Sequence, residues 1–133
     1  MIYLPDTNAW IGFLNADGSK VQQRLKTTES SEIRLCSVVK AELYFGAERS
    51  SRREENLRLL DELFAGIESV NFDDAAAKKY GRIRSDLAFK GTPIGPNDLM
   101  IASIALVNDM VLVTHNTREF SRVATLKIED WEA

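Results

Sequence analysis

Three acidic residues stand out because each lies in an apolar stretch of the sequence. Asp6 occurs in "MIYLPDTNAW", Glu42 in "SVVKAELYFGA" and Asp98 in "IGPNDLMIASIAL". A carboxylate in apolar surroundings must be paired, hydrogen-bonded or bound to a cation, because an isolated buried charge is strongly unfavourable. Neither Glu42 nor Asp98 has a basic residue three or four positions away to neutralise it within a helix. The three positions are therefore candidates for a shared cation site.

The residue types indicate which cation and which chemistry such a site would support. Carboxylate oxygens suit Mg²⁺, with Mn²⁺ able to substitute, whereas zinc more usually takes His or Cys ligands. Such an ion activates water and holds a phosphodiester for in-line attack. His115 is the only histidine, so a pair of histidines acting as acid and base is excluded. The pattern favours metal-assisted hydrolysis of a phosphodiester.

Helix capping explains two of the three positions without any chemistry. Asp6 precedes an expected helix, and its carboxylate could accept hydrogen bonds from amides of the first turn. Asp98 lies in the first turn of a helix expected to begin at Pro96, where a carboxylate interacts favourably with the helix dipole. Glu42 lies too far along its helix for this role, and Ser37 is the expected cap there. The sequence leaves both interpretations of Asp6 and Asp98 open.

A fourth candidate region is "VLVTHNTREF". Asn116 could contact a metal through its side-chain oxygen or through water, and Thr114 could hydrogen-bond a carboxylate. Both residue types are also common in turns. His115 is expected to be exposed and not catalytic, and Glu119 is expected to be a solvated helix residue rather than a ligand.

The distribution of apolar residues predicts how these positions are brought together. Strands are predicted for residues 2–4, 33–36, 67–70, 111–113 and 126–128. Helices are predicted for residues 7–14 continuing into 21–26, and for 38–47, 54–65, 75–89, 96–108 and 117–121. Alternating strands and helices predict a three-layer α/β/α domain with a central, mostly parallel sheet of about five strands. Such sheets place their sites at the carboxyl ends of the strands, so the acidic residues could meet at one edge.

Composition is that of one soluble domain spanning residues 1–133. Apolar residues make up 44% of the chain and charged residues 28%, a balance found in globular proteins. No secretory signal or membrane span is expected, and a cytoplasmic location is predicted. Cys36 is the only cysteine, which rules out an internal disulfide, and its apolar neighbours predict a buried strand position.

The net charge of −3 argues only weakly against a nucleic-acid partner. If three carboxylates occupy one metal-filled pocket, the remainder balances to −3 + 3 = 0, and basic clusters can act locally. One cluster holds Arg49, Arg52, Arg53 and Arg58, and the other holds Lys78, Lys79, Arg82, Arg84 and Lys90. Arg82 and Arg84 are the candidate contacts to a nucleic-acid substrate.

Four segments together resemble the PIN-domain ribonucleases, and within them the VapC toxins of bacterial type II toxin-antitoxin pairs. The segments are "LPDTNAWI", "SVVKAELYFGA", "TPIGPNDLMIASIAL" and "LVTHNTREFSRV", in this order across the chain. The resemblance implies that Asp6 and Asp98 bind Mg²⁺ directly, with Glu42 touching the ion or holding its water. Asn116 stands where many relatives have a further aspartate. This departure removes one negative charge, and the number of ions, one or two, stays open.

The resemblance also implies a biological role. It implies cleavage of RNA, in several members a transfer RNA, with growth arrest as the outcome and a VapB-type antitoxin as the inhibitor. The antitoxin would lay an extended segment along an apolar groove formed by helices 38–47 and 54–65, and homodimerisation is expected.

Three other functions are weighed against this one. A haloacid-dehalogenase-like phosphatase needs a second aspartate two residues after Asp6, where the chain has Asn8. A receiver-like phosphate acceptor needs a lysine late in the chain after a strand, and "VLVTHN" offers none. The serious alternative is a catalytically inactive PIN-like module that binds proteins and keeps its carboxylates as caps.

Overall fold

Five short strands form close to the five apolar runs. The computed structural model describes residues 1–15 and 18–133. Its strands are β1 (Tyr3–Pro5), β2 (Leu35–Cys36), β3 (Ser69–Val70), β4 (Val111–Val113) and β5 (Ile128–Glu129). Each strand lies within or beside a predicted segment, so the prediction of five strands is confirmed.

Helices fill the connections between the strands. They are α1 (Thr7–Asn15), α2 (Lys20–Thr27), α3 (Ser37–Glu48), α4 (Arg53–Ala65), α5 (Asp74–Lys90), α6 (Pro96–Val107) and α7 (Thr117–Phe120), with a 3₁₀ turn at Ser30–Glu32. Ser19 caps the start of α2, since its Oγ accepts a hydrogen bond from the Gln22 amide at 3.1 Å. The predicted continuation of the first helix into the second crosses residues 16–17, which lie outside the described residues.

The strands pair in parallel, as predicted, but in two short ladders rather than one continuous sheet. One ladder has the order β1-β4-β5 and the other joins β2 to β3. A single parallel bridge between Tyr3 and Ile33 links them, with the Arg34 amide donating to the Tyr3 carbonyl at 2.9 Å. Strands of two or three residues are too short to pair along a greater length. The resulting order is β3-β2-β1-β4-β5.

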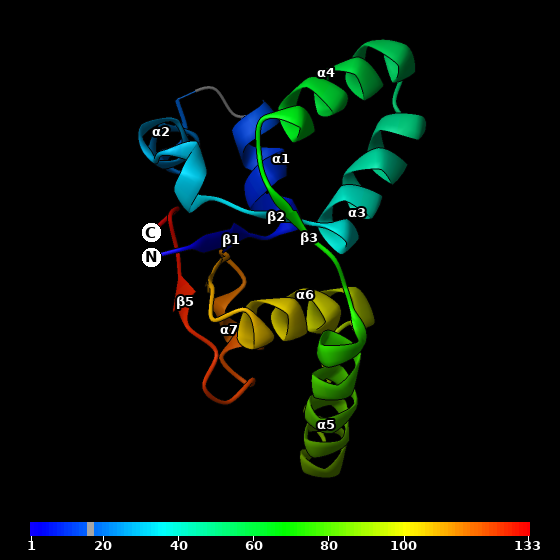
Figure 1. Ribbon diagram of the computed structural model, residues 1–133, viewed down its shortest axis with the longest axis vertical. Helices are drawn as coiled ribbons and strands as arrows, with labels where there is room; N and C mark the ends of the chain where they lie inside the picture. The colour runs from blue at the N-terminus through cyan, green and yellow to red at the C-terminus, as the bar shows by residue number, and fades with distance from the viewer. Residues whose placement is uncertain (16–17) are drawn as a thin grey trace.

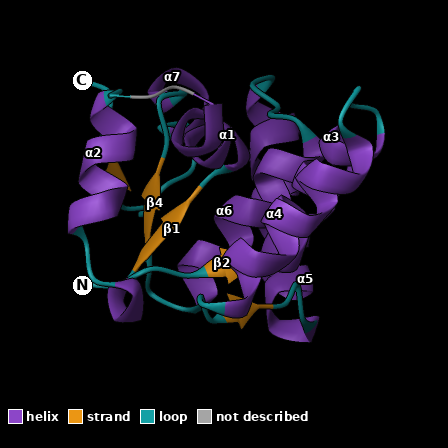
Figure 2. Ribbon diagram, turned by 90° about the horizontal axis from the view of Figure 1, so that it is seen from above, coloured by secondary structure: helices purple, strands orange, loops and turns teal. Residues whose placement is uncertain are grey.

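Helices cover both faces of these strands, which confirms the three-layer α/β/α architecture. Figure 1 shows α1 to α4 on one side of β1 and β2 and α5 to α7 on the other. Figure 2 shows β1 and β4 side by side at the centre. The strand order reverses direction between β1 and β4, and the crevice at such a reversal is where open α/β sheets bind ligands.

The core fixes the position of α6. Leu99, Ile101, Ala102 and Ile104 of this helix are at most 1% exposed, so α6 is buried on more than one face. The Ser103 hydroxyl is also buried and donates to the Leu99 carbonyl at 2.7 Å, which satisfies it within the helix. A helix held in this way places its first turn, and therefore Asp98, with little freedom.

Two local predictions can be compared with the structure. Cys36 is fully buried in β2, as predicted, and burial raises the pKa of its thiol. The prediction that Ser37 caps α3 is wrong, because Cys36 is the N-cap and Ser37 is the first helical residue. The Ser37 Oγ instead accepts a hydrogen bond from the Phe72 amide at 3.2 Å.

Among the helices of residues 1–15 and 18–133, none is long and apolar enough to cross a membrane.

Candidate active site

Asp6 lies directly beyond β1 and is both a helix cap and a buried acid. Its amide donates to the Val113 carbonyl at 2.9 Å, which continues the pairing of β1 with β4. Its Oδ1 accepts a hydrogen bond from the Ala9 amide at 2.8 Å and so caps α1. Burial raises the pKa of Asp6, although hydrogen bonds from Thr114 and Ala9 oppose the rise. The capping interpretation is therefore correct for Oδ1, and the carboxylate also accepts a hydrogen bond from Thr114.

Glu42 connects the first turns of two other helices. Thr7 Oγ1 donates to Glu42 Oε1 at 2.5 Å, and Asn97 Nδ2 lies 3.5 Å from Glu42 Oε2. Thr7 begins α1 next to Asp6, and Asn97 lies next to Asp98 in α6. The side chain of Glu42 therefore reaches the place where the start of α1 meets the start of α6.

Asp98 shows how closely the acidic residues converge. It lies in the first turn of α6 and is half-buried. Its pKa is raised from 3.8 to about 6, first by burial and then by the negative charges of Asp6, Glu42 and Glu119. Three carboxylates from separate parts of the chain thus act on Asp98 near the carboxyl edge of β1 and β4. We call Asp6, Glu42, Asp98 and Glu119 the acidic cluster.

The segment after β4 contributes more to this edge than its sequence indicated. The Asn116 amide donates to Thr114 Oγ1 at 3.0 Å, and Asn116 Nδ2 donates to Glu119 Oε2 at 3.1 Å. Phe120 is fully buried and anchors α7 in the core. Glu119 is consequently half-buried and close enough to raise the pKa of Asp98. The expectation that it is a solvated helix residue rather than a ligand stays a prediction.

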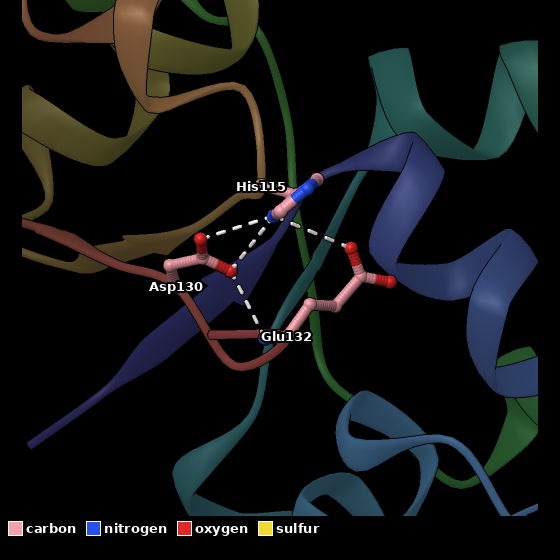
Figure 3. A group of neighbouring side chains, drawn as sticks. All are labelled: His115, Asp130 and Glu132. Carbon is pink, nitrogen blue, oxygen red and sulfur yellow. Dashed lines mark hydrogen bonds and ion pairs between the residues drawn. The ribbon is translucent and has the colours of Figure 1, made fainter.

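His115 belongs to a second group of polar side chains, which the sequence analysis did not identify (Figure 3). Its Nδ1 lies 3.0 Å from Asp130 Oδ2 and 3.6 Å from Glu132 Oε2. The hydrogen bond to Asp130 is the main reason that the pKa of His115 is raised. His115 is exposed, as expected. Asp130 directly follows β5, just as Asp6 follows β1, and this position was the signal that could have revealed it.

The two groups differ in how tightly their ligand atoms gather. Among the described residues, His115, Asp130 and Glu132 form the only set of three or more His, Cys, Asp or Glu side chains whose ligand atoms all lie within 4.8 Å of one another. The oxygens of the acidic cluster are therefore more widely spaced. Wider spacing suits an ion that keeps some of its water, as Mg²⁺ usually does.

An open cleft of about 640 Å³ lies beside Glu42. Its polar lining includes Thr7, Asn97 and Glu42, and its apolar lining includes Ile11 and Phe45. A neighbouring groove of about 300 Å³ runs between α1, α3 and α4 and shares Glu42 and Ile11 with the cleft. An exposed apolar path therefore leads to the edge of the acidic cluster.

Comparison with known proteins identifies the family to which this architecture belongs. The family model described as PIN domain matches residues 3–126. The chain is 38% identical over 129 residues to the tRNA(fMet)-specific endonuclease VapC of Shigella flexneri, and the match covers 97% of both proteins. The chain belongs to the VapC ribonucleases of the PIN-domain family. Ribonuclease VapC2 of Rickettsia felis is 35% identical, with 99% of each chain covered.

Solved structures agree with this assignment. A VapBC complex from Salmonella typhimurium, bound to DNA, contains a chain that superposes with a TM-score of 0.89 at 36% identity, covering 98% of each chain. The predicted PIN-type α/β fold and the predicted endoribonuclease activity of a VapC toxin are thereby confirmed. PIN nucleases are typically metal-dependent, and the names of the similar proteins specify no particular ion.

Proposed function

We propose that this VapC ribonuclease is a Mg²⁺-dependent toxin whose acidic cluster holds the ion, and that residues 1–133 form one catalytic domain. The observation that carries the proposal is the electrostatic convergence on Asp98, whose pKa is raised to about 6. Helix capping alone would not explain why Glu42, Asp98 and Glu119, which come from three different helices, gather with Asp6. A divalent cation would offset their repulsion.

The donor set fits such an ion. All four side chains offer hard oxygen atoms, and no nitrogen or sulfur ligand is needed. We assign direct contacts to Asp6 and Asp98. Glu42 already accepts a hydrogen bond from Thr7 at 2.5 Å, so we assign it the role of holding water beside the ion. A bound Mg²⁺ supplies positive charge to a phosphodiester and makes water more acidic.

Other residues of the chain orient this cluster. Thr114 hydrogen-bonds the Asp6 carboxylate, which restricts how that carboxylate can turn. Asn116 holds Glu119 by a hydrogen bond of 3.1 Å. We propose that Glu119 supplies the fourth negative charge, while Asn116 positions it. The raised pKa of Asp98 makes this group able to take up a proton near neutral pH when no ion is bound.

The proposed substrate is RNA, and specifically a transfer RNA. The support is the similarity to the tRNA(fMet)-specific endonuclease VapC of Shigella flexneri, at 38% identity. The chemistry of the acidic cluster is compatible with this substrate, because a hard divalent ion binds phosphate oxygens. The carboxylates themselves make no distinction among RNA sequences.

The proposed inhibitor is a VapB-type antitoxin. The solved relatives from Salmonella typhimurium and Rickettsia felis are VapBC structures. In this chain the apolar groove between α1, α3 and α4 exposes Ile11, Leu14 and Leu59, and it opens next to Glu42. An extended apolar segment could occupy the groove and direct a basic side chain to the acidic cluster. We also propose a homodimer, as in the sequence-based expectation.

Cleavage of transfer RNA tests the catalytic proposal. Asp98→Asn removes one ligand charge without changing side-chain size, so cleavage in Mg²⁺ should fall roughly 100-fold or more. Glu62→Gln is the matched control, because Glu62 is an exposed acid on α4 outside the cluster. EDTA should stop the wild-type reaction reversibly. Wild-type rates in Asp98→Asn, or cleavage that persists in EDTA, would refute the proposal.

A further inference from the structure

A groove lined by positive charge lies on the side of the sheet that carries α5 and α6. It has a volume of about 250 Å³ and runs between α5, the end of α6 and the segment after α7. Four basic residues line it, Lys79, Arg82, Lys90 and Arg122, against one acid, Asp86. We call this groove, with its four cations, the basic groove. Figure 1 shows α5, α6 and α7 on the face opposite α1 to α4.

In the described part of the chain, the cations of the basic groove outnumber the acid that lines it with them and form no ion pair. Within the described part of the chain, Lys79, Arg82 and Lys90 form no salt bridge. The other basic cluster behaves differently, since Arg53 contacts Glu48 at 2.6 Å and Arg52 lies 3.8 Å from Glu55. Like charges gathered in one groove repel one another unless an anion occupies it. The basic groove therefore has unused capacity for an anionic ligand.

One end of the basic groove is tied to the loop that leads into α6. Arg122 follows α7, which carries Glu119, and its guanidinium donates to the Pro93 carbonyl at 2.9 Å. Pro93 lies in the loop that leads into α6, five residues before Asp98. The opposite end is set by Lys79. The eleven helical steps from Lys79 to Lys90 correspond to roughly 16 Å along the helix, enough for two or three consecutive phosphates.

We propose that the basic groove binds the phosphate backbone of the RNA and leads it to the acidic cluster. The proposal takes its ligand from the proposed ribonuclease function. Side chains of Lys and Arg that contact phosphates position a nucleic acid without reading its sequence. They also explain how a chain with net charge −3 binds a polyanion, because the positive charge is concentrated in one place.

The two arginines predicted from the sequence to contact nucleic acid lie in different places in the structure. Arg82 lines the basic groove. Arg84 does not line it, because its guanidinium donates to the Tyr80 hydroxyl at 2.7 Å and lies over the Tyr80 ring. Lys78 is exposed and also outside the groove, whereas its neighbour Lys79 lines it. The same helix therefore offers two pairs of cations with equal charge and different locations.

Salt-dependent RNA binding tests the proposal. The probe is a fluorescein-labelled single-stranded RNA of about 16 nucleotides, and anisotropy is measured in EDTA so that neither cleavage nor metal affects the result. The test variant is Lys79→Ala with Arg82→Ala, and the matched control is Lys78→Ala with Arg84→Ala. Lys90→Ala alone provides a second test if the double variant fails to fold.

The basic groove predicts a difference between these two variants. The test variant should bind the RNA about 10-fold to 100-fold more weakly, and its log–log salt slope should fall by about 1.4, since each lost phosphate contact removes about 0.7. The control should remain within about twofold of the wild type. Equal losses in both variants would show a general charge effect and overturn the proposal. Unchanged RNA binding in the test variant would also overturn it. Weakened antitoxin binding in the same variant would then assign the groove to the antitoxin.

A cleavage assay in Mg²⁺ separates this proposal from the one on which it rests. If the wild type binds RNA through the basic groove but cleaves none, the groove stands and the ribonuclease proposal fails. If the wild type cleaves RNA and the test variant binds as the wild type does, the ribonuclease proposal stands and the groove fails. Where both hold, the test variant should show a raised KM for RNA with kcat little changed.

Discussion

The carboxyl group of Asp98 bears much of the electrostatic cost of the acidic cluster. Burial and the charges of Asp6, Glu42 and Glu119 raise its pKa to about 6. In the folded protein it therefore holds a proton at pH values where the unfolded chain has released it. Folding without a cation is penalised once Asp98 ionises, which links stability to pH and to metal.

Asp98→Asn should reveal this penalty. The ordinary pKa of an aspartate is 3.8, and the stability that depends on the Asp98 proton is fully present below that pH. This stability is lost as the pH rises through about 6, the pKa of Asp98 in the folded protein. Metal-free Asp98→Asn should therefore exceed the wild type in free energy of unfolding at pH 7.5, by about 1–2 kcal/mol, given about 1.4 kcal/mol per pKa unit reduced by solvent screening. The two proteins should converge near pH 4. Urea unfolding in EDTA measures the difference.

Metal provides the control for that experiment. Mg²⁺ should raise the melting temperature of the wild type and leave that of Asp98→Asn nearly unchanged, since an ion stabilises only the state that binds it. Glu62→Gln should respond as the wild type does. An advantage of Asp98→Asn that is the same at both pH values would show that the Asp98 carboxyl group is not perturbed by the cluster.

The sequence indicated three residues of the acidic cluster and did not indicate the fourth. Asp6, Glu42 and Asp98 were visible because each is a carboxylate within an apolar segment. Glu119 was not, because its burial depends on Phe120 entering the core and on the hydrogen bond from Asn116. The burial of Phe120 is a tertiary contact that the sequence does not reveal. The hydrogen bond spans only three residues, but it needs the chain to turn into α7 after β4.

Among the elements, α6 does most to position the site, and the turn before it depends on one glycine. Gly91 follows α5 in the left-handed region, at φ 71°, and its amide donates to the Ala88 carbonyl at 3.1 Å. This cap redirects the chain toward Pro96, where α6 begins. A side chain at this position is strained whatever the space around it.

Two glycine substitutions on α5 should have opposite effects. Gly91→Ala should lower the free energy of unfolding by about 1 kcal/mol, because alanine disfavours a positive φ. Gly81→Ala should raise it by about 0.5–1 kcal/mol, because Gly81 is inside the helix and nothing lies within 4 Å of an added Cβ. Thermal unfolding in the same buffer measures both. A stabilising effect of Gly91→Ala would contradict the capping role.

Element types were predictable from the sequence, whereas their exact contacts were not. Apolar periodicity is a local property, and it located α4, α5 and α6 within one or two residues. The single bridge between Tyr3 and Ile33 could not be foreseen, because it depends on how two short strands diverge. The same holds for Ser37, whose hydroxyl contacts the segment after β3 rather than capping α3.

Across the whole molecule, opposite charges are gathered in separate regions. The acidic cluster lies at the carboxyl edge of β1 and β4, where the strand order reverses. The basic groove lies along α5, between that helix, the end of α6 and the segment after α7. Although the net charge is −3, the basic groove can therefore hold a polyanion while the acidic cluster holds a cation.

The position of a bound Mn²⁺ tests the central claim most directly, because the molecule offers two places for a divalent ion. Crystals soaked in Mn²⁺ would locate it by anomalous scattering. The acidic cluster predicts a peak about 2.1 Å from oxygen atoms of Asp6 and Asp98, the distance usual for a small hard cation. A peak only among His115, Asp130 and Glu132, the more tightly gathered set, with none at Asp6 and Asp98, would contradict the account.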